Sequence, residues 1–513
     1  MSRGHQKEIS LTARAAWFMF ARTLAFAFSF ALPLLLVRRL SQHEFGLYKQ
    51  VFLVATTAMT TLPFGFGMSA FYFLPREKER QGAVVFNILI FYTVIGGLAF
   101  LALVIHPALL ETIFNSPELI EYGPVIGLLS LLWMVASFLE IVAIANEESK
   151  LATFFIIAFQ FAKALLLLAT AVSFASVKSL IYAAIIHGVL QTVALVWYLR
   201  SRFGPFWKSF SWQVMRMQMS YALPLGFAAF LLRAHSDLHN YFVAYRFDAA
   251  TFAIYTIGCF NFLLVEILVE AVGTVMIPRV SYLQSENRRR EIIELVARMM
   301  RKLAAVFFPL YVFLMITGRE FITMLFTEQY RASWPIFAIN LTMIPLALIA
   351  SAYDPVVRAY PEQRYFLIRM RAALLVVLMA GLWAGTNRFG LTGAITVVVA
   401  VSAIERLVTA YKCGKMLGVT WPDIALLKDL GKIALAAIAA GVVTVAARSL
   451  VVGAAPVLVM LVCGITFSIA YLAAIFMLGV ISPGERGLIK EKIALLQSLS
   501  RWKRETAPIG EEV

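Results

Sequence analysis

Long apolar runs separated by short polar connections dominate this sequence. A helix of about 20 apolar residues is long enough to cross the hydrocarbon core of a bilayer. Fourteen such runs can be read, and they cover residues 13–37, 46–73, 82–106, 123–145, 150–174, 178–199, 218–245, 250–277, 303–318, 332–352, 366–386, 390–411, 430–452 and 456–480. The ninth run is short, and its helix is expected to begin before residue 303. The pattern predicts an all-α polytopic membrane protein of about 14 transmembrane helices.

The composition excludes the common soluble classes. Hydrophobic residues make up 61% of the 513 residues and charged residues 14%, whereas soluble chains average about half apolar and a quarter charged. No long polar block is present, so a membrane anchor carrying a large soluble domain is excluded too. The three cysteines, Cys259, Cys413 and Cys463, lie in or beside apolar runs and show no metal-binding or redox spacing.

The distribution of cations predicts the orientation of the chain. The formal net charge is +16, from 45 Lys and Arg against 29 Asp and Glu. Loops on the same side as both termini carry 32 of these cations and the opposite loops carry 9. Since cytoplasmic loops are enriched in Lys and Arg, both termini are predicted to be cytoplasmic. The cations are spread over many short loops, which argues against nucleic acid as a partner and favours membrane lipids.

The chain contains an internal repeat. Residues 39–48 and 246–255 align at a constant offset of 207, with Arg, Phe and Tyr at matching positions. Six predicted helices separate the copies, so both have the same orientation, as in a parallel transporter repeat. The repeat predicts two pseudo-symmetric six-helix lobes, residues 1–207 and 208–418. Residues 419–513 would add two helices and an amphipathic cytoplasmic tail that begins at Ser482.

Ionisable residues inside the predicted helices mark candidate sites, because charges at membrane depth face a cavity or a partner. Arg22 and Lys163 have no partner on their own helix. Unpaired cations in a cavity suit phosphate, which Arg binds bidentately. Structural pairing, for example with Glu140, is the alternative for these two cations.

Two further pairs of charges share a helix face. Arg233 and Asp237 are four residues apart, so they either neutralise each other or form a cavity wall that binds an anion and a cation. Glu266 and Glu270 share the same spacing and have no cation on their own helix. These carboxylates suit coupling to a proton or Na⁺, unless a neighbouring helix supplies a cation.

The sequence predicts neither a metal site nor a cofactor. His235 and His239 are four residues apart, but no zinc-site pattern surrounds them. No Gly-rich phosphate loop and no Ser/His/Asp or Cys/His constellation is found, so an enzyme is not expected. A membrane-bound polymerase or oligosaccharyltransferase would also need a sizeable outer loop, and the predicted outer loops are short.

Five segments, in order over residues 10–420, resemble motifs of one bacterial family. The run Arg39-Leu40-Ser41-Gln42-His43-Glu44-Phe45-Gly46-Leu47-Tyr48 resembles the "RxLxxxEFGxY" segment of polysaccharide (Wzx-like) flippases, the O-antigen and exopolysaccharide exporters of the multidrug/oligosaccharidyl-lipid/polysaccharide (MOP) superfamily. The other matches are Ser236-Asp237 with Tyr241-Phe242 and Tyr255, residues 276–281, residues 321–332, and residues 390–395. The chain departs at Leu238, where the family has Arg, at Ala253, where the family has Gly, and at Thr327, where it also has Gly.

The resemblance implies a carrier built as a V-shaped pair of six-helix bundles, which alternates between inward-open and outward-open states. Its cargo would be an undecaprenyl-pyrophosphate-linked oligosaccharide, moved across the bacterial inner membrane, with a polysaccharide polymerase as an expected partner. A sugar on a diphosphate on a long lipid needs a polar, cationic and laterally open cavity. Two alternatives remain open within the superfamily: a lipid II flippase, whose two extra helices help form a lipid groove, and a multidrug or cation antiporter.

Overall fold

The computed structural model describes residues 31–480 of the chain. Nearly all of these residues are helical, and none of them forms a strand. The first predicted transmembrane run, which carries Arg22, lies largely outside the described residues, as does the predicted amphipathic tail. The helices of five or more residues are α2 (Gln42–Thr61), α3 (Ser69–Phe73), α4 (Gln81–Ile105), α5 (Ala108–Phe114), α6 (Glu118–Ala145), α7 (Ser149–Ser173), α8 (Val177–Phe203), α9 (Trp212–Arg246), α10 (Ala249–Gly258), α11 (Leu263–Ser285), α12 (Arg289–Phe326), α13 (Trp334–Leu341), α14 (Met343–Ala359), α15 (Arg364–Leu417), α17 (Lys428–Ser449) and α18 (Pro456–Met477).

The helices have the length and composition of membrane spans. Within residues 31–480, nine are long and apolar enough to cross a bilayer, and up to eleven if each of two bent pairs is counted as one span. The bent pairs are α2 with the following short helices, at 43°, and α10 with α11, at 54°. The predicted fold class, an all-α polytopic membrane protein, is confirmed.

Helix α15 is two predicted spans joined by a tight turn. Gly390 has φ 59° and ψ −136°, which interrupts the helical backbone. A Cβ on Gly393 would lie 2.0 Å from the carbonyl oxygen of Gly385, so the backbones of the two legs are in direct contact. Only glycine allows so close an approach. The turn separates the runs predicted at 366–386 and 390–411.

Helix α9 spans 35 residues but is not among the apolar membrane-spanning helices. Its second half carries Arg233, His235, Asp237 and His239, which lower its mean hydropathy. Polar residues at this depth require a polar surface to face. Helix α9 is therefore expected to face a polar interior with its second half.

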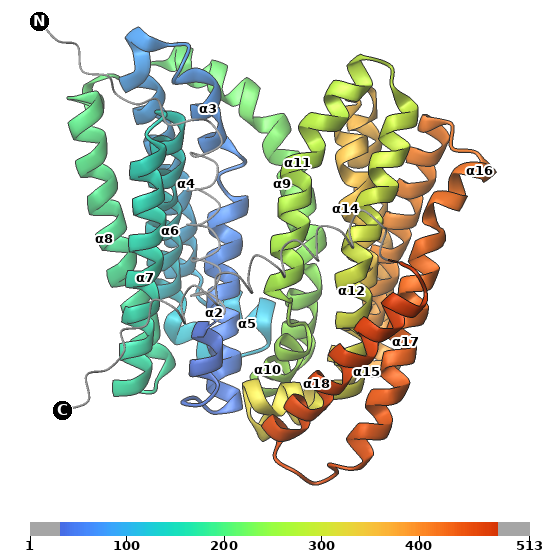
Figure 1. Cartoon of the computed structure of the whole chain (residues 1–513). Coiled ribbons are helices and arrows are strands. Elements are labelled where there is room, and N and C mark those ends of the chain that lie inside the picture. The colour runs from blue at the N-terminus through green and yellow to red at the C-terminus, as the bar shows by residue number, and fades with distance from the viewer. Residues whose placement is uncertain (1–30, 481–513) are drawn as a thin grey trace, which may run out of the picture.

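The helices form two groups that approach each other at one end (Figure 1). At that end α2 and α10 touch closely, since a Cβ on Gly46 would lie 1.8 Å from the carbonyl oxygen of Ala249. Two hydrogen bonds reinforce the contact: Arg38 Nη2 donates to the Met324 carbonyl at 3.0 Å, and Gln329 Nε2 donates to the Val37 carbonyl at 3.0 Å. We call this region the closed end.

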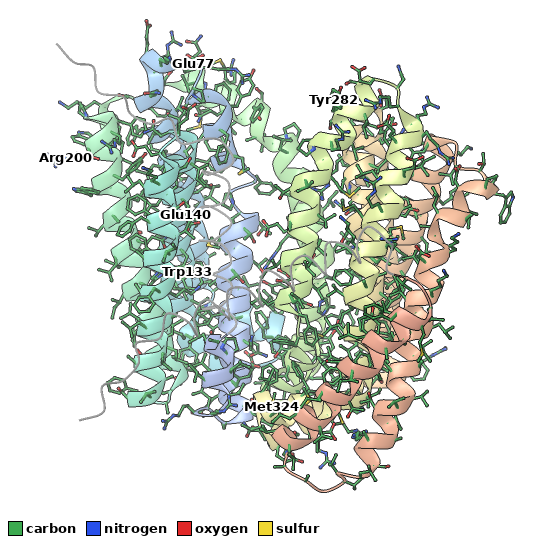
Figure 2. The ribbon with its side chains drawn as sticks, viewed as in Figure 1. Glu77, Trp133, Glu140, Arg200, Tyr282 and Met324 are labelled. Atoms are coloured by element: carbon green, nitrogen blue, oxygen red, sulfur yellow. The ribbon has the colours of Figure 1, made fainter. Side chains whose placement is uncertain are left out.

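The opposite end carries the connections that contain residues 76–80 and 288–290, both rich in Lys and Arg. Glu77 lies at the tip of one group and Tyr282 at the tip of the other, while Met324 lies at the closed end (Figure 2). The predicted lobe boundaries, after residues 207 and 418, fall in connections between long helices. The division of the chain into these three parts stays a prediction.

The two copies of the repeat begin their helices in the same way. Ser41 caps α2 by accepting a hydrogen bond from the backbone N–H of Glu44, and Asp248 caps α10 by accepting one from Thr251. The two caps are 207 residues apart, the offset at which the sequence repeats. A side chain at this position satisfies a backbone donor that the first helical turn leaves unpaired.

Candidate functional site

A polar cavity of about 670 Å³ lies among α2, α9, α10 and the helices α13 to α15. We call it the central cavity. Its ionisable lining residues, apart from Cys259, are Lys49, Arg233, His235, Asp237, His239, Asp354, Arg371, Glu405 and Arg406. Charged groups are costly at membrane depth unless they are paired or hydrated, so this concentration marks a wet interior.

The first ion pair of the central cavity lies on α9. Arg233 Nε is 2.5 Å from Asp237 Oδ2. Thr57 of α2 donates a hydrogen bond to the same carboxylate oxygen at 3.3 Å, which ties α2 to α9. Sequence analysis left open whether these charges neutralise each other or form a cavity wall. In the structure the pair is formed, and both residues line the cavity.

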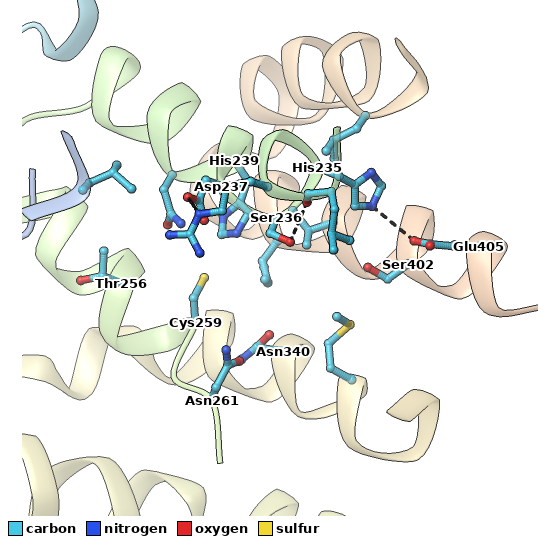
Figure 3. A pocket seen from close by; sticks show the side chains of 18 of the residues that line it. His235, Ser236, Asp237, His239, Thr256, Cys259, Asn261, Asn340, Ser402 and Glu405 are labelled. Atoms are coloured by element: carbon cyan, nitrogen blue, oxygen red, sulfur yellow. Dashed lines mark hydrogen bonds and ion pairs between the residues drawn. The ribbon is translucent and has the colours of Figure 1, made fainter. Parts of the chain in front are cut away.

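The second ion pair joins the two legs of α15. Arg371 Nε lies 2.9 Å from Glu405 Oε1, and both side chains are less than one-fifth exposed. His235 of α9 approaches the other oxygen of Glu405 at 3.7 Å (Figure 3). Glu405 thus connects the α15 hairpin to the polar helix.

The charges of the cavity do not balance. Four cations (Lys49, Arg233, Arg371 and Arg406) face three carboxylates (Asp237, Asp354 and Glu405), histidines apart. Lys49 and Arg406 form no ion pair within residues 31–480: Lys49 lies 5.3 Å from the centroid of the Phe45 ring, and Arg406 donates to the carbonyl of Met343 at 3.3 Å. A cavity with unpaired cations favours an anionic ligand.

A smaller cavity of about 260 Å³ adjoins the central one. It holds Glu266 and shares Asn261, Asn340 and Arg406 with the central cavity. Asn261 hydrogen-bonds Glu266. Of the two carboxylates of α11 that the sequence singled out for ion coupling, Glu266 therefore lines a cavity, whereas Glu270 lines neither of the two.

Lys163 lies away from the central cavity, in the group formed by α2 to α8. Its ammonium is 4.1 Å from the centroid of the Trp133 ring, a cation–π contact. Glu140 is near enough for its charge to act on Lys163, and Figure 2 shows Trp133 and Glu140 on the same helix. This position matches the structural alternative more closely than substrate contact. Arg22 lies outside the described residues.

Sequence reasoning missed three charged residues of the cavity. Lys49 and Arg371 were counted as loop cations, and Asp354 was not singled out. The signal was present: α2 begins directly after Ser41, so Lys49 lies two turns inside a helix, and Arg371 lies two turns inside α15. Within residues 31–480 no group of three or more His, Cys, Asp or Glu residues could hold a metal ion.

Solved structures of transporters share this fold. The lipid II flippase MurJ, in an inward closed conformation, aligns with a TM-score of 0.69 at 12% identity over 92% of this chain and all of that one. An inward-facing multidrug resistance MATE family transporter of the MOP superfamily aligns with a TM-score of 0.57 at 12% identity, over 80% of this chain and 95% of that one. A Pyrococcus furiosus MOP superfamily transporter, described as having a binding pocket of reversed polarity, aligns with a TM-score of 0.54 at 12% identity, over 79% and 96%.

At such identities these likenesses establish the fold. A search of curated proteins finds no match. The model of one protein family, described as polysaccharide biosynthesis protein, matches residues 35–335, more than half of the chain. The chain therefore belongs to the polysaccharide biosynthesis protein family and is a multi-pass membrane protein with the fold of MOP superfamily transporters.

Proposed function

We propose that this protein is a flippase for undecaprenyl-pyrophosphate-linked oligosaccharides. It moves the headgroup from the cytoplasmic to the outer leaflet of the bacterial inner membrane by alternating access, with both termini in the cytoplasm. The observation that carries the proposal is the central cavity, which places more cations than carboxylates inside an otherwise apolar helical body. Family membership in polysaccharide biosynthesis supports the sugar part of the cargo.

The cavity chemistry suits a diphosphate that carries a sugar. Lys49 and Arg406 form no ion pair within residues 31–480, and charge-assisted hydrogen bonds to phosphate are stronger than those between neutral groups. Asn261, Asn340 and Ser402 add donors and acceptors for sugar hydroxyls. Of the three cations singled out from the sequence, Arg233 is the strongest candidate for substrate contact, because it lines the cavity.

The arrangement of the helices supports an inward-facing state. The closed end lies opposite the connections near Glu77 and Tyr282 (Figure 2), which the distribution of cations assigns to the cytoplasm. To release cargo outward, the contacts between α2 and α10 and the hydrogen bonds at the closed end must separate.

Ion coupling is a second part of the proposal. Asp237 lines the central cavity and Glu266 lines the smaller cavity that shares residues with it, so either carboxylate can exchange a proton or Na⁺ when the exposure of these cavities changes. Glu270, which lines neither cavity, is the weakest of the three coupling candidates. Asp237→Asn and Glu266→Gln should block turnover while expression is retained, and normal export by both variants would refute coupling through these groups.

Reconstitution tests the flippase directly. Purified protein in liposomes should make a fluorescent undecaprenyl-pyrophosphate oligosaccharide in the inner leaflet accessible to a quencher outside. Arg233→Ala should slow this more than Arg233→Lys, since the lysine keeps a positive charge. Flipping at the wild-type rate by both variants would rule out phosphate contact by Arg233. An absence of flipping by correctly folded wild-type protein would contradict the proposal.

A lipid II flippase is the runner-up, because the MurJ structure aligns over its whole length with a TM-score of 0.69. The same liposomes decide between the two when they carry fluorescent lipid II instead. Faster flipping of lipid II than of the polysaccharide precursor would favour the runner-up. Proton release driven by a cationic drug, with no flipping of either lipid, would instead identify an antiporter.

A further inference from the structure

A second charged cavity, of about 580 Å³, lies at the closed end. The end of α12 and the segment after it form one wall, and the junction of α17 and α18 forms the other. Its charged lining residues are Arg319, Glu320, Glu328, Arg331 and Arg448. No residue of the central cavity takes part in it, so it is a separate site, which we call the arginine pocket.

The concentration of arginine in this pocket runs against the charge pattern of the whole chain. The loops on this side carry only 9 of the 45 Lys and Arg residues, as the positive-inside rule requires. Three of those nine converge on this one cavity: Arg319 and Arg331 from neighbouring segments, and Arg448 from a segment more than a hundred residues later. Orientation in the membrane gives no reason for such a gathering, so another role must explain it.

The charges in the arginine pocket leave one cation in excess. Arg448 Nη2 pairs with Glu320 Oε1 at 2.6 Å, and Arg331 Nη1 pairs with Glu328 Oε1 at 2.8 Å. Arg319 forms no ion pair within the part of the chain that the structure describes; its guanidinium lies 5.9 Å from the centroid of the Trp334 ring. Its donors are available to an anion, and the exposed Arg331–Glu328 pair is weak enough to exchange partners.

Most of the remaining lining is apolar, and part of it is highly exposed. Val445 and Val452 line the pocket and are 55% and 82% exposed. Neighbouring Leu450 is 86% exposed, and helices α17 and α18 lie on the outside of their group (Figure 1). A ligand that matches both halves of this surface has an anionic head and apolar chains.

We propose that the arginine pocket binds the phosphate headgroup of an outer-leaflet lipid, whose chains lie along α17 and α18. The ligand class is a phosphate mono- or diester on a hydrocarbon chain. Arg319 contacts the phosphate directly, and Arg331 turns from Glu328 toward it. This proposal does not depend on the identity of the cargo in the central cavity.

Native mass spectrometry of the purified full-length protein, titrated with a phosphatidylglycerol, tests the proposal. Arg319→Gln and Arg331→Gln should each weaken retention of one lipid roughly tenfold, because a hydrogen bond to a charged group contributes at least about one factor of ten. Arg388→Gln is the matched control: Arg388 is an exposed cation on the same side, outside the pocket, and this variant should bind like the wild type.

Inorganic phosphate, added alone, distinguishes a site for a lipid phosphate from a site for free phosphate. A lipid site predicts that phosphatidylglycerol protects the wild type from heat denaturation and that the same concentration of inorganic phosphate does not. The protection by phosphatidylglycerol should be lost in Arg319→Gln. Equal protection by inorganic phosphate would overturn the assignment to a lipid. The same lipid retention in all three variants would overturn the site itself.

Discussion

The contact between Gly46 and Ala249 should control the state of the closed end. A Cβ on Gly46 would lie 1.8 Å from the Ala249 carbonyl oxygen and 2.4 Å from its carbon, and both are backbone atoms that cannot rotate away. Ordinary van der Waals contact begins near 3.4 Å, so Gly46→Ala must push α2 and α10 apart by about 1.6 Å. Overpacking of this kind costs about 1–3 kcal/mol.

That cost falls only on the state in which the two helices touch. A destabilisation of about 1–3 kcal/mol shifts a two-state equilibrium by roughly 5- to 150-fold. Gly46→Ala should therefore enrich the form that is open at this end, and slow transport by depleting the form seen here. Gly97→Ala is the matched control, since no heavy atom lies within 4 Å of the added Cβ.

The separation can be measured between spin labels at Thr112 of α5 and Arg388 of α15, two exposed residues on opposite helix groups. The native cysteines would first be replaced by alanine. Gly46→Ala should increase the population with the longer distance at least fivefold, and Gly97→Ala should leave the distribution unchanged. An unchanged distribution in a folded Gly46→Ala protein would refute the view that this contact closes the end.

Three further predictions concern charge pairs and the α15 turn. Glu405→Ala should destabilise the protein by about 1–3 kcal/mol, because Arg371 loses its hydrogen-bonded carboxylate although it still faces the cavity; thermal unfolding should show this, and joint replacement of both by methionine should recover much of the loss. Lys163→Met should flip lipid at the wild-type rate per folded molecule, since Lys163 lies away from the central cavity. A tenfold lower rate would show that Lys163 contacts the substrate after all. Gly393→Ala should lower the yield of folded protein sharply, because its Cβ would meet the Gly385 carbonyl oxygen at 2.0 Å; normal yield and melting temperature would contradict the hairpin contact.

Apolar run length predicted the helices well, but not their bends. The break after α2 falls at Leu62-Pro63-Phe64-Gly65, where proline and glycine are visible breakers inside an apolar run. The break between α10 and α11 falls at Cys259-Phe260-Asn261-Phe262, which contains neither. Mean hydropathy over the length of a span does not resolve such short segments. The sequence therefore predicted one span for α2 with α3 and one span for α10 with α11. The interruption of α15 was predicted in position, since one apolar run was read to end at residue 386 and the next to begin at residue 390.

The candidate site was predicted only in part, for a geometric reason. A helix surrounded by lipid and other helices shows little amphipathic contrast, so the sequence cannot say which face meets a cavity. Arg233 and Asp237 line the cavity, whereas Lys163, equally isolated in the sequence, packs on Trp133. Residues such as Arg371 and Glu405 became recognisable as a pair only once the hairpin brought the two legs of α15 together.

Photo-crosslinking from inside the central cavity tests the central claim most directly. A photoreactive amino acid at Ser402, which lines the cavity, should capture a radiolabelled sugar of the undecaprenyl-pyrophosphate substrate. The same group at Leu461, a 58% exposed residue of α18 outside the cavity, is the control. The account predicts sugar crosslinks from Ser402 that excess unlabelled substrate removes, and none from Leu461. Sugar crosslinks of equal yield from both positions, or from Leu461 alone, would contradict it.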